Sequence, residues 1–135
     1  MLRILSLIVV STFPLQAFAI EKCRSQSDPT CVVDGDTIRL DGERIRLQSF
    51  DTPEPYTNIC GGEAEVALAH RAADRLVEIL NHGIARKSIA LQTHGIDRYG
   101  RTLATITVDG VDVGDTLIAE GLARRWPDGP EFWCR

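Results

Sequence analysis

The chain has 135 residues, of which 44% are hydrophobic and 25% are charged, and its formal net charge is −4. This composition is typical of a soluble globular protein, and the length allows one domain with its own core but not two. Because the net charge is negative, any contact with a polyanion must depend on a local cluster of arginines and not on the overall field.

Residues 1–19 have the features of a cleavable signal peptide. Arg3 precedes an apolar run, and the segment ends on Ala17-Phe18-Ala19, which fits the small-x-small rule for signal peptidase. The run is short and interrupted, whereas a membrane-spanning helix needs about 20 mostly apolar residues. We therefore expect an exported protein, periplasmic or secreted, with residues 20–135 as its single domain. An uncleaved membrane anchor is the alternative.

Four cysteines accompany this leader and indicate two disulfides formed in an oxidising compartment. They are Cys23, Cys31, Cys60 and Cys134. No C-x-x-C pair exists, so a structural zinc site is the weaker interpretation. Sequence alone allows three pairings. We favour Cys23 with Cys31 and Cys60 with Cys134, because the second bond would tie the end of the chain to the start of the first helix.

The first part of the domain is predicted to be a three-stranded meander. Its strands are expected at residues 31–33, 37–40 and 44–50. The turns between them contain Asp-Gly, which is among the stronger hairpin signals. Two prolines within Asp51–Pro55 then end the third strand, because proline cannot continue a ladder of hydrogen bonds.

Two helices and two further strands are expected in the rest of the chain. Apolar residues at steps of three and four predict a helix over residues 63–82, with Gly83 as its stop. Strands are expected at 88–93 and 102–108, and Asp112 can cap a second helix. This order predicts an α+β, mainly β fold: a five-stranded OB-fold barrel with one helix between strands 3 and 4 and a second, C-terminal helix.

Two aspartates are placed where a barrel can bring them to one rim. Asp36 ends the first turn, and Asp51 ends the third strand. Like charges brought close together favour a cation between them, and oxygen ligands favour a hard one. We expect Ca²⁺, with Mg²⁺ as the second choice, because Ca²⁺ accepts mixed oxygen ligands in flexible geometry. Asp34 is placed to orient bound water. The alternative for Asp34 and Asp36 is that they simply form a hairpin turn.

Three more residues complete a phosphate-processing set. Arg46 and Arg101 are candidates for holding a phosphate through paired hydrogen bonds, which lysine cannot make. Glu54, in a loop stiffened by Pro53, is a candidate base for activating water. Each of the three taken alone could equally be a solvated surface charge. Their joint occurrence is what favours catalysis.

The segments VVDGDTIRL, RIRLQSFDTPE, DRYGRTLA and LIAEGLAR, in this order, resemble the staphylococcal-nuclease (thermonuclease) family. The likeness runs from about Val32 to Arg125. It implies an OB-fold, Ca²⁺-dependent endonuclease action on DNA and RNA, and water attacking phosphorus in line with the leaving 5′ oxygen. The resemblance further implies roles for six residues: Asp36 and Asp51 as metal ligands, Thr52 as a ligand through its backbone carbonyl, Glu54 as the base, and Arg46 and Arg101 on the phosphate.

The chain also departs from the family pattern. The loop after Glu54 is short and lacks lysines, and Trp126 followed by Pro127 replaces a tyrosine pair. Tyr99 and Trp126 are candidates for stacking on bases, worth about 1–3 kcal/mol per base, although such aromatic residues more often only pack. These departures bear on substrate affinity more than on chemistry.

Two other classes of function remain open at this stage. One is a non-catalytic OB-fold module that binds single-stranded nucleic acid or oligosaccharide, since the fold hosts both. Family members are also named from succinoglycan-type polysaccharide biosynthesis, a label that no residue here supports. The other class is a disulfide-stapled structural module. We expect a monomer with DNA or RNA as substrate, no stable protein partner and no membrane contact after leader cleavage.

Overall fold

The first three strands form the antiparallel meander that the sequence predicts. They are β1 (Cys31–Asp34), β2 (Thr37–Leu40) and β3 (Glu43–Leu47). The computed structural model describes residues 19–134, so the predicted leader lies outside the described residues except for Ala19. Within that range, no helix is both long enough and apolar enough to cross a bilayer.

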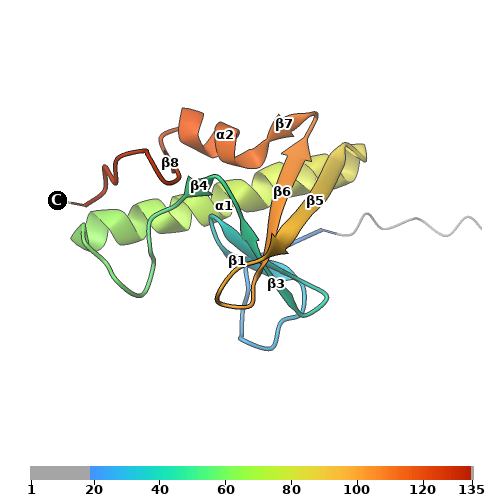
Figure 1. Cartoon of the computed structure of the whole chain (residues 1–135), viewed down its shortest axis with the longest axis horizontal. Coiled ribbons are helices and arrows are strands. Elements are labelled where there is room, and N and C mark those ends of the chain that lie inside the picture. The colour runs from blue at the N-terminus through green and yellow to red at the C-terminus, as the bar shows by residue number, and fades with distance from the viewer. Residues whose placement is uncertain (1–18, 135) are drawn as a thin grey trace, which may run out of the picture.

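Two longer strands extend the meander into one sheet (Figure 1). β6 (Thr102–Val108) pairs parallel with β3, and β5 (Ile89–Ile96) pairs antiparallel with β6, which gives the order β1-β2-β3-β6-β5. The short β7 (Val111–Asp112) also pairs with β6. The α+β, mainly β architecture is therefore confirmed. The strand pairs of the described residues leave the sheet open between β1 and β5, so the expected barrel is not closed.

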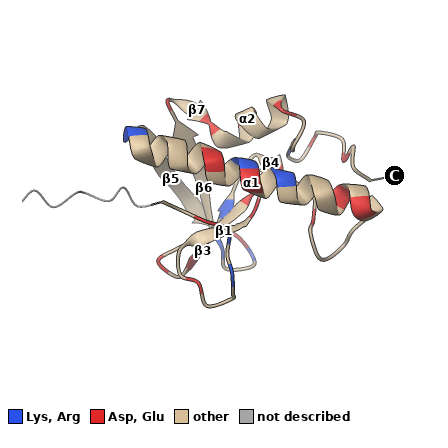
Figure 2. Ribbon diagram, turned by 180° about the vertical axis from the view of Figure 1, so that it is seen from behind, with Lys and Arg blue, Asp and Glu red and all other residues tan. Residues whose placement is uncertain are grey.

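The core lies between this sheet and the helix α1 (Gly62–Arg86). In Figure 2 this helix crosses in front of the sheet. Alternate strand residues and one face of each helix bury their apolar side chains together. Among the largest fully buried side chains of this core are Val32, Ile45, Leu47, Phe50, Leu76, Leu80, Val113 and Leu117. Acidic residues in the first turn of α1 and Arg86 in its last turn complement the helix dipole.

The prediction that α1 stops at Gly83 is wrong. The helix continues to Arg86 and ends at Lys87, which has φ 54° in the left-handed region. Gly83 is buried inside the helix because the chain passes close to β6 there: a Cβ at this position would lie 2.8 Å from Val108 Cγ2. Close approach of two elements, and not helix termination, requires glycine at this position.

The third predicted strand, 44–50, is divided in the structure. Ser49 has φ 76°, which separates β3 from β4 (Phe50–Asp51). β4 instead pairs with β8 (Arg124–Arg125), a two-residue strand near the C-terminus that the sequence pattern does not predict. The last helix, α2 (Val113–Ala119), begins as predicted, because the Asp112 carboxylate accepts the Gly114 N–H at 2.7 Å. The C-terminal segment is thus paired, through β8, with β4, the second half of the predicted third strand.

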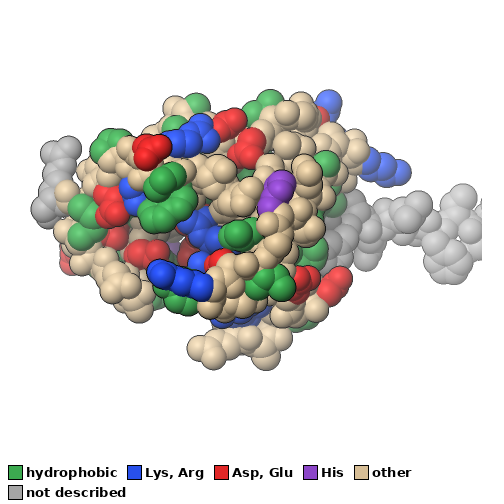
Figure 3. Space-filling view, in the orientation of Figure 1, with side chains coloured by type: hydrophobic (Ala, Val, Ile, Leu, Met, Phe, Trp, Pro, Cys, Tyr) green, Lys and Arg blue, Asp and Glu red, His purple; other side chains and the backbone are tan. Residues whose placement is uncertain are grey.

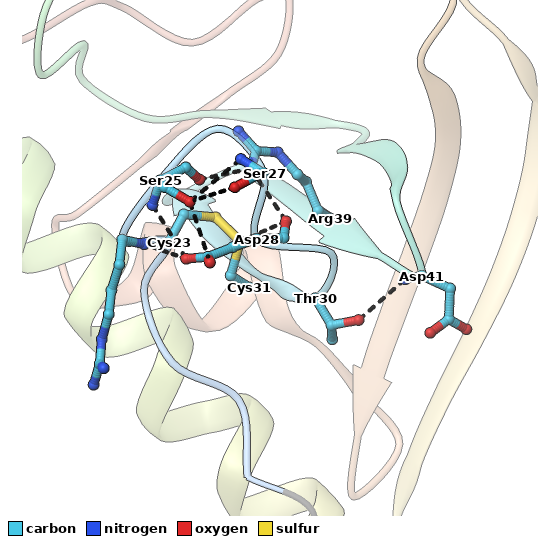
Figure 4. The surroundings of a disulfide bond; sticks show 9 residues. Cys23, Ser25, Ser27, Asp28, Thr30, Cys31, Arg39 and Asp41 are labelled. Atoms are coloured by element: carbon cyan, nitrogen blue, oxygen red, sulfur yellow. Dashed lines mark hydrogen bonds between the residues drawn. A yellow bond between two sulfur atoms is a disulfide. The ribbon is translucent and has the colours of Figure 1, made fainter.

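Both favoured disulfides are present. Cys23–Cys31 closes a loop before β1 (Figure 4), and Cys60–Cys134 joins the segment before α1 to the end of the described chain. The second bond spans 74 residues, so it restricts the unfolded chain far more than the first, which spans 8.

We expect Gly83→Ala to destabilise the fold although alanine is the better helix former by up to about 1 kcal/mol. The new methyl group would also lie 3.1 Å from Ile89 Cβ. Overpacking of this kind lowers the free energy of unfolding by about 1–3 kcal/mol, measured by urea denaturation. Arg71→Ala, at an exposed position of the same helix, is the control and should stay within about 0.5 kcal/mol. A more stable Gly83→Ala would contradict the packing described.

Candidate active site

One hollow of about 470 Å³ collects nearly all the residues that the sequence singles out. Figure 3 shows acidic and basic side chains gathered around it on the face seen in Figure 1. The predicted residues that line it are Asp34, Asp36, Arg46, Asp51, Glu54, Tyr99, Arg101 and Trp126. Thr52 is buried beside them at 2% exposure. The fold therefore brings together segments that are up to ninety-two positions apart in the sequence.

Asp36 is fixed by the tight turn between β1 and β2. A Cβ on Gly35 would lie 2.7 Å from Thr52 Cγ2 and 2.9 Å from the Ala72 Cβ, so only glycine allows this turn to approach so closely. The buried Asp36 carboxylate accepts the Thr52 N–H at 3.1 Å and the Thr37 hydroxyl at 3.0 Å. The bond from Thr52 joins the turn to the segment that follows β4.

Arg46 lies between the two carboxylates that the sequence assigns to a metal. Its Nη2 is 3.4 Å from Asp36 Oδ2 and 3.8 Å from Asp51 Oδ1, and it donates to the Phe50 carbonyl at 3.0 Å. Its Nη1 donates to the Leu47 carbonyl. Asp36, in the β1–β2 turn, and Asp51, at the end of β4, therefore direct oxygens toward a common point. Arg46 is held by backbone carbonyls and is not a solvated charge.

Burial and nearby negative charge raise the pKa of three carboxyl groups in the hollow, those of Asp34, Asp51 and Glu54. Burial first, and then the charge of Asp36, raises the pKa of Asp34 to about 8. Burial also raises the pKa of Asp51 and of Glu54; for Glu54 the charges of Asp36 and Asp51 add to the effect. The arginines therefore do not fully compensate the charged forms of these three carboxyl groups, which is the electrostatic setting of a cation site.

Arg124 holds the outer oxygen of Asp51 and was missed from the sequence. Its Nε donates to Asp51 Oδ2 at 2.9 Å, its Nη1 to the Gly129 carbonyl at 2.6 Å, and its Nη2 to Glu131 at 3.0 Å. The side chain is only 8% exposed. The segment LIAEGLAR contains this arginine, so the signal was present, but only the β4–β8 pairing places it against Asp51.

Glu65 organises the loop that carries Glu54 and was also missed. This carboxylate is fully buried and accepts backbone N–H groups of Glu54 at 3.3 Å, Cys60 at 2.8 Å and Gly61 at 2.9 Å. The Cys60–Cys134 disulfide lies next to it, and because both sulfurs are bonded to each other the group is not a metal site. Helical periodicity alone assigns a first-turn glutamate to solvent.

The turn after β5 leads to Arg101, the second arginine that the sequence predicts to hold a phosphate. Arg101 donates through Nε to Asp97 Oδ2 at 2.9 Å, and Asp97 also accepts the backbone N–H groups of Tyr99 and Arg101. The Arg101 guanidinium lies 5.4 Å from the centroid of the Tyr99 ring. Tyr99 is 63% exposed and Trp126 is 51% exposed, so both aromatic rings are accessible at the hollow.

The family model for staphylococcal nuclease homologues (SNase) matches residues 44–130. The chain belongs to this family. The matched SNase segment contains Arg46, Asp51, Glu54 and Arg101, while Asp36 in the preceding turn lies outside it.

Three curated relatives are similar to this SNase chain. Succinoglycan biosynthesis protein ExoI of Rhizobium meliloti (strain 1021) is 38% identical over 95 residues, which are 68% of this chain and 48% of ExoI. SPbeta prophage-derived endonuclease YokF and endonuclease YncB, both of Bacillus subtilis (strain 168), are each 36% identical over 97 residues. These cover 68% of this chain, 31% of YokF and 44% of YncB. The chain spans less than half the length of each of these relatives.

We expect Arg124→Met to lower the free energy of unfolding by about 2–4 kcal/mol, because it leaves buried acceptors on Asp51 and Gly129 without a donor. Arg125→Met is the matched control: Arg125 is exposed, and within residues 19–134 its side chain pairs only with the exposed Asp115, at 2.8 Å, a contact worth at most about 1 kcal/mol. Urea denaturation of both variants measures the difference. Equal losses would show that Arg124 does not anchor the site.

Proposed function

We propose that this SNase domain is an exported, Ca²⁺-dependent endonuclease that hydrolyses phosphodiester bonds of DNA or RNA. One observation carries the proposal: Asp36, Asp51 and Glu54 share a hollow with Arg46 and Arg101. This is the set that phosphoryl chemistry needs, namely cation ligands, a base and donors to the developing negative charge. The endonuclease names of two relatives support the same reaction class.

The residues present fit a hard divalent cation. The donors at the convergent point are carboxylate oxygens of Asp36 and Asp51, and no histidine or cysteine of residues 19–134 lines the hollow. Thr52, whose N–H donates to Asp36 Oδ2, would contribute its backbone carbonyl. Oxygen donors in mixed geometry favour Ca²⁺ over Mg²⁺. When bound, such an ion supplies Lewis-acid polarisation of a phosphate oxygen. Asp34 lies beside these ligands and accepts the Asp36 N–H at 3.1 Å.

In the proposed reaction Glu54 accepts a proton, and Arg46 and Arg101 bind the phosphate. A water oxygen attacks phosphorus as the bond to the 5′ oxygen breaks, and Glu54 accepts the proton that the water loses. The leaving 5′ oxygen takes a proton from solvent, which gives a 3′-phosphate and a 5′-hydroxyl. Arg46 and Arg101 donate to the non-bridging oxygens as charge builds on them. The described contacts of Arg101 use only Nε and the backbone N–H, which leaves its Nη groups for a phosphate.

A non-catalytic binding module for nucleic acid or oligosaccharide is the competing proposal. The printed name of ExoI concerns succinoglycan biosynthesis, and it describes that protein. A binder has no use for a half-buried glutamate beside two arginines, and burial of this kind destabilises the charged form of Glu54. We therefore favour catalysis.

Cleavage of single- and double-stranded DNA and of RNA by the disulfide-intact protein tests the function. We expect Ca²⁺-dependent cutting that stops in excess chelator. Loss of a general base predicts a rate about 10²- to 10⁴-fold lower for Glu54→Gln, with substrate affinity nearly unchanged. Arg46→Ala should lower both rate and affinity, because it removes a phosphate donor. Ca²⁺ binding without any cutting would favour the binding module, and equal loss of rate and affinity in Glu54→Gln would remove the assigned base.

Export is supported by the two disulfides, which persist in oxidising compartments, and by the leader motif. We expect the protein recovered from the periplasm or medium to begin at Ile20. Peptide mapping without reduction should yield Cys23 linked to Cys31 and Cys60 linked to Cys134. Recovery from the cytoplasm with an intact N-terminus and free thiols would contradict export.

A further inference from the structure

A second hollow adjoins the candidate active site and contains two arginines that the proposed mechanism does not use. It has a volume of about 540 Å³ and is lined by Arg39 and Arg44 and by the loop that precedes β1. Thr37 lines both hollows, so the two surfaces meet at this residue. The feature needs an explanation because the chain as a whole is acidic.

The β2–β3 ladder places these arginines in line with Arg46. Thr37 pairs with Arg46, and Arg39 pairs directly with Arg44. Ile45 and Leu47, at the alternate positions of β3, are buried in the core. Since side chains alternate along a strand, Arg44 and Arg46 share the other face, about 6.6 Å apart along β3. These arginine positions therefore start at the candidate active site and lead away from it along the β2–β3 ladder.

Arg39 is held in place by the disulfide loop. Its Nη1 donates to the Ser25 carbonyl at 2.9 Å and to the Asp28 carbonyl at 3.2 Å (Figure 4). The Cys23–Cys31 bond closes the same loop. The hydrogen bonds that Arg39 makes within residues 19–134 use only Nη1, so the other N–H groups of its guanidinium are available to a ligand. The loop thus acts as a support for a cationic side chain.

The charge of this pair is left without a partner in the described part of the chain. Like charges directly opposite each other on neighbouring strands are destabilising, yet no carboxylate within residues 19–134 forms an ion pair with Arg39 or the exposed Arg44. Asp28, which also lines the hollow, accepts the N–H groups of Arg24 and Ser25 within its own loop. Glu43 is bonded to the Thr102 hydroxyl. Such an uncompensated local cost is expected where a ligand binds.

We propose that Arg44 and Arg39 form a second phosphate-binding site, which holds the phosphate next to the scissile one in a bound polynucleotide strand. The inference rests on the proposed function, because it extends the path of the same substrate. Arginine suits this role, since its planar group donates two hydrogen bonds to a phosphate. Phosphates that follow one another in an extended strand fit the separation of Arg46 and Arg44. The site favours longer substrates through backbone contacts and reads no base sequence.

Binding of two fluorescein-labelled single-stranded DNA ligands tests the proposal. A dinucleotide has one phosphate and reaches only the active site, whereas a 12-mer also reaches the second site. Affinities are measured with Ca²⁺ at several salt concentrations, in disulfide-intact protein carrying Glu54→Gln so that the ligand is not cut. Arg44→Gln is added to this background. Arg86→Gln is the matched control: it removes the same charge from an exposed arginine that lines neither hollow.

We expect Arg44→Gln to weaken 12-mer binding about 3- to 10-fold and to reduce the salt slope by about 0.7, the value for one lost phosphate contact on a single strand. Dinucleotide affinity should not change, and Arg86→Gln should alter neither ligand. The proposal is overturned if Arg44→Gln behaves like Arg86→Gln, or if it weakens both ligands equally. If the parent protein binds neither ligand, the proposed function fails, and the second site fails with it.

Discussion

The site depends on holding several carboxylates close together in a partly buried hollow. Asp34, Asp36, Asp51 and Glu54 all line it, and burial raises the pKa of Asp34, Asp51 and Glu54. Arg46, between Asp36 and Asp51, and Arg124, on the outer oxygen of Asp51, offset part of this cost. The raised pKa values indicate that this compensation is incomplete. The cation that we propose would stabilise the charged forms of the same carboxyl groups.

The chain end is part of this arrangement rather than an appendage. β8 pairs with β4, so Arg124 reaches Asp51 from the C-terminal segment. The Cys60–Cys134 disulfide then fixes that segment to the loop after Glu54, and Glu65 accepts N–H groups from the same loop. Strand pairing, a disulfide and side-chain hydrogen bonds therefore connect Asp51 and the loop that carries Glu54 to the C-terminal segment. Rigid support of this kind is what positions catalytic groups to within the tolerance that chemistry requires.

Local patterns predict β1, β2 and β6 and the helix cap at Asp112. The residues proposed for the site belong to short motifs near strand ends, and a small sheet brings them to one hollow. Arg124, Glu65 and Gly83 could not be assigned in this way. Their roles come from contacts between distant segments: a two-residue strand pair, a buried carboxylate under a loop, and a helix pressed against β6. Neither periodicity nor turn chemistry encodes such contacts.

The central claim is that the convergent carboxylates hold a hard cation. Isothermal titration of Ca²⁺ into the disulfide-intact protein, beside Asp36→Asn, tests it most directly, with far-UV circular dichroism to verify that both remain folded. The account predicts one bound Ca²⁺ per chain and loss of most of that affinity in the folded variant, because one charged ligand is removed. Absence of Ca²⁺ binding in the parent protein, or unchanged binding in Asp36→Asn, would contradict it.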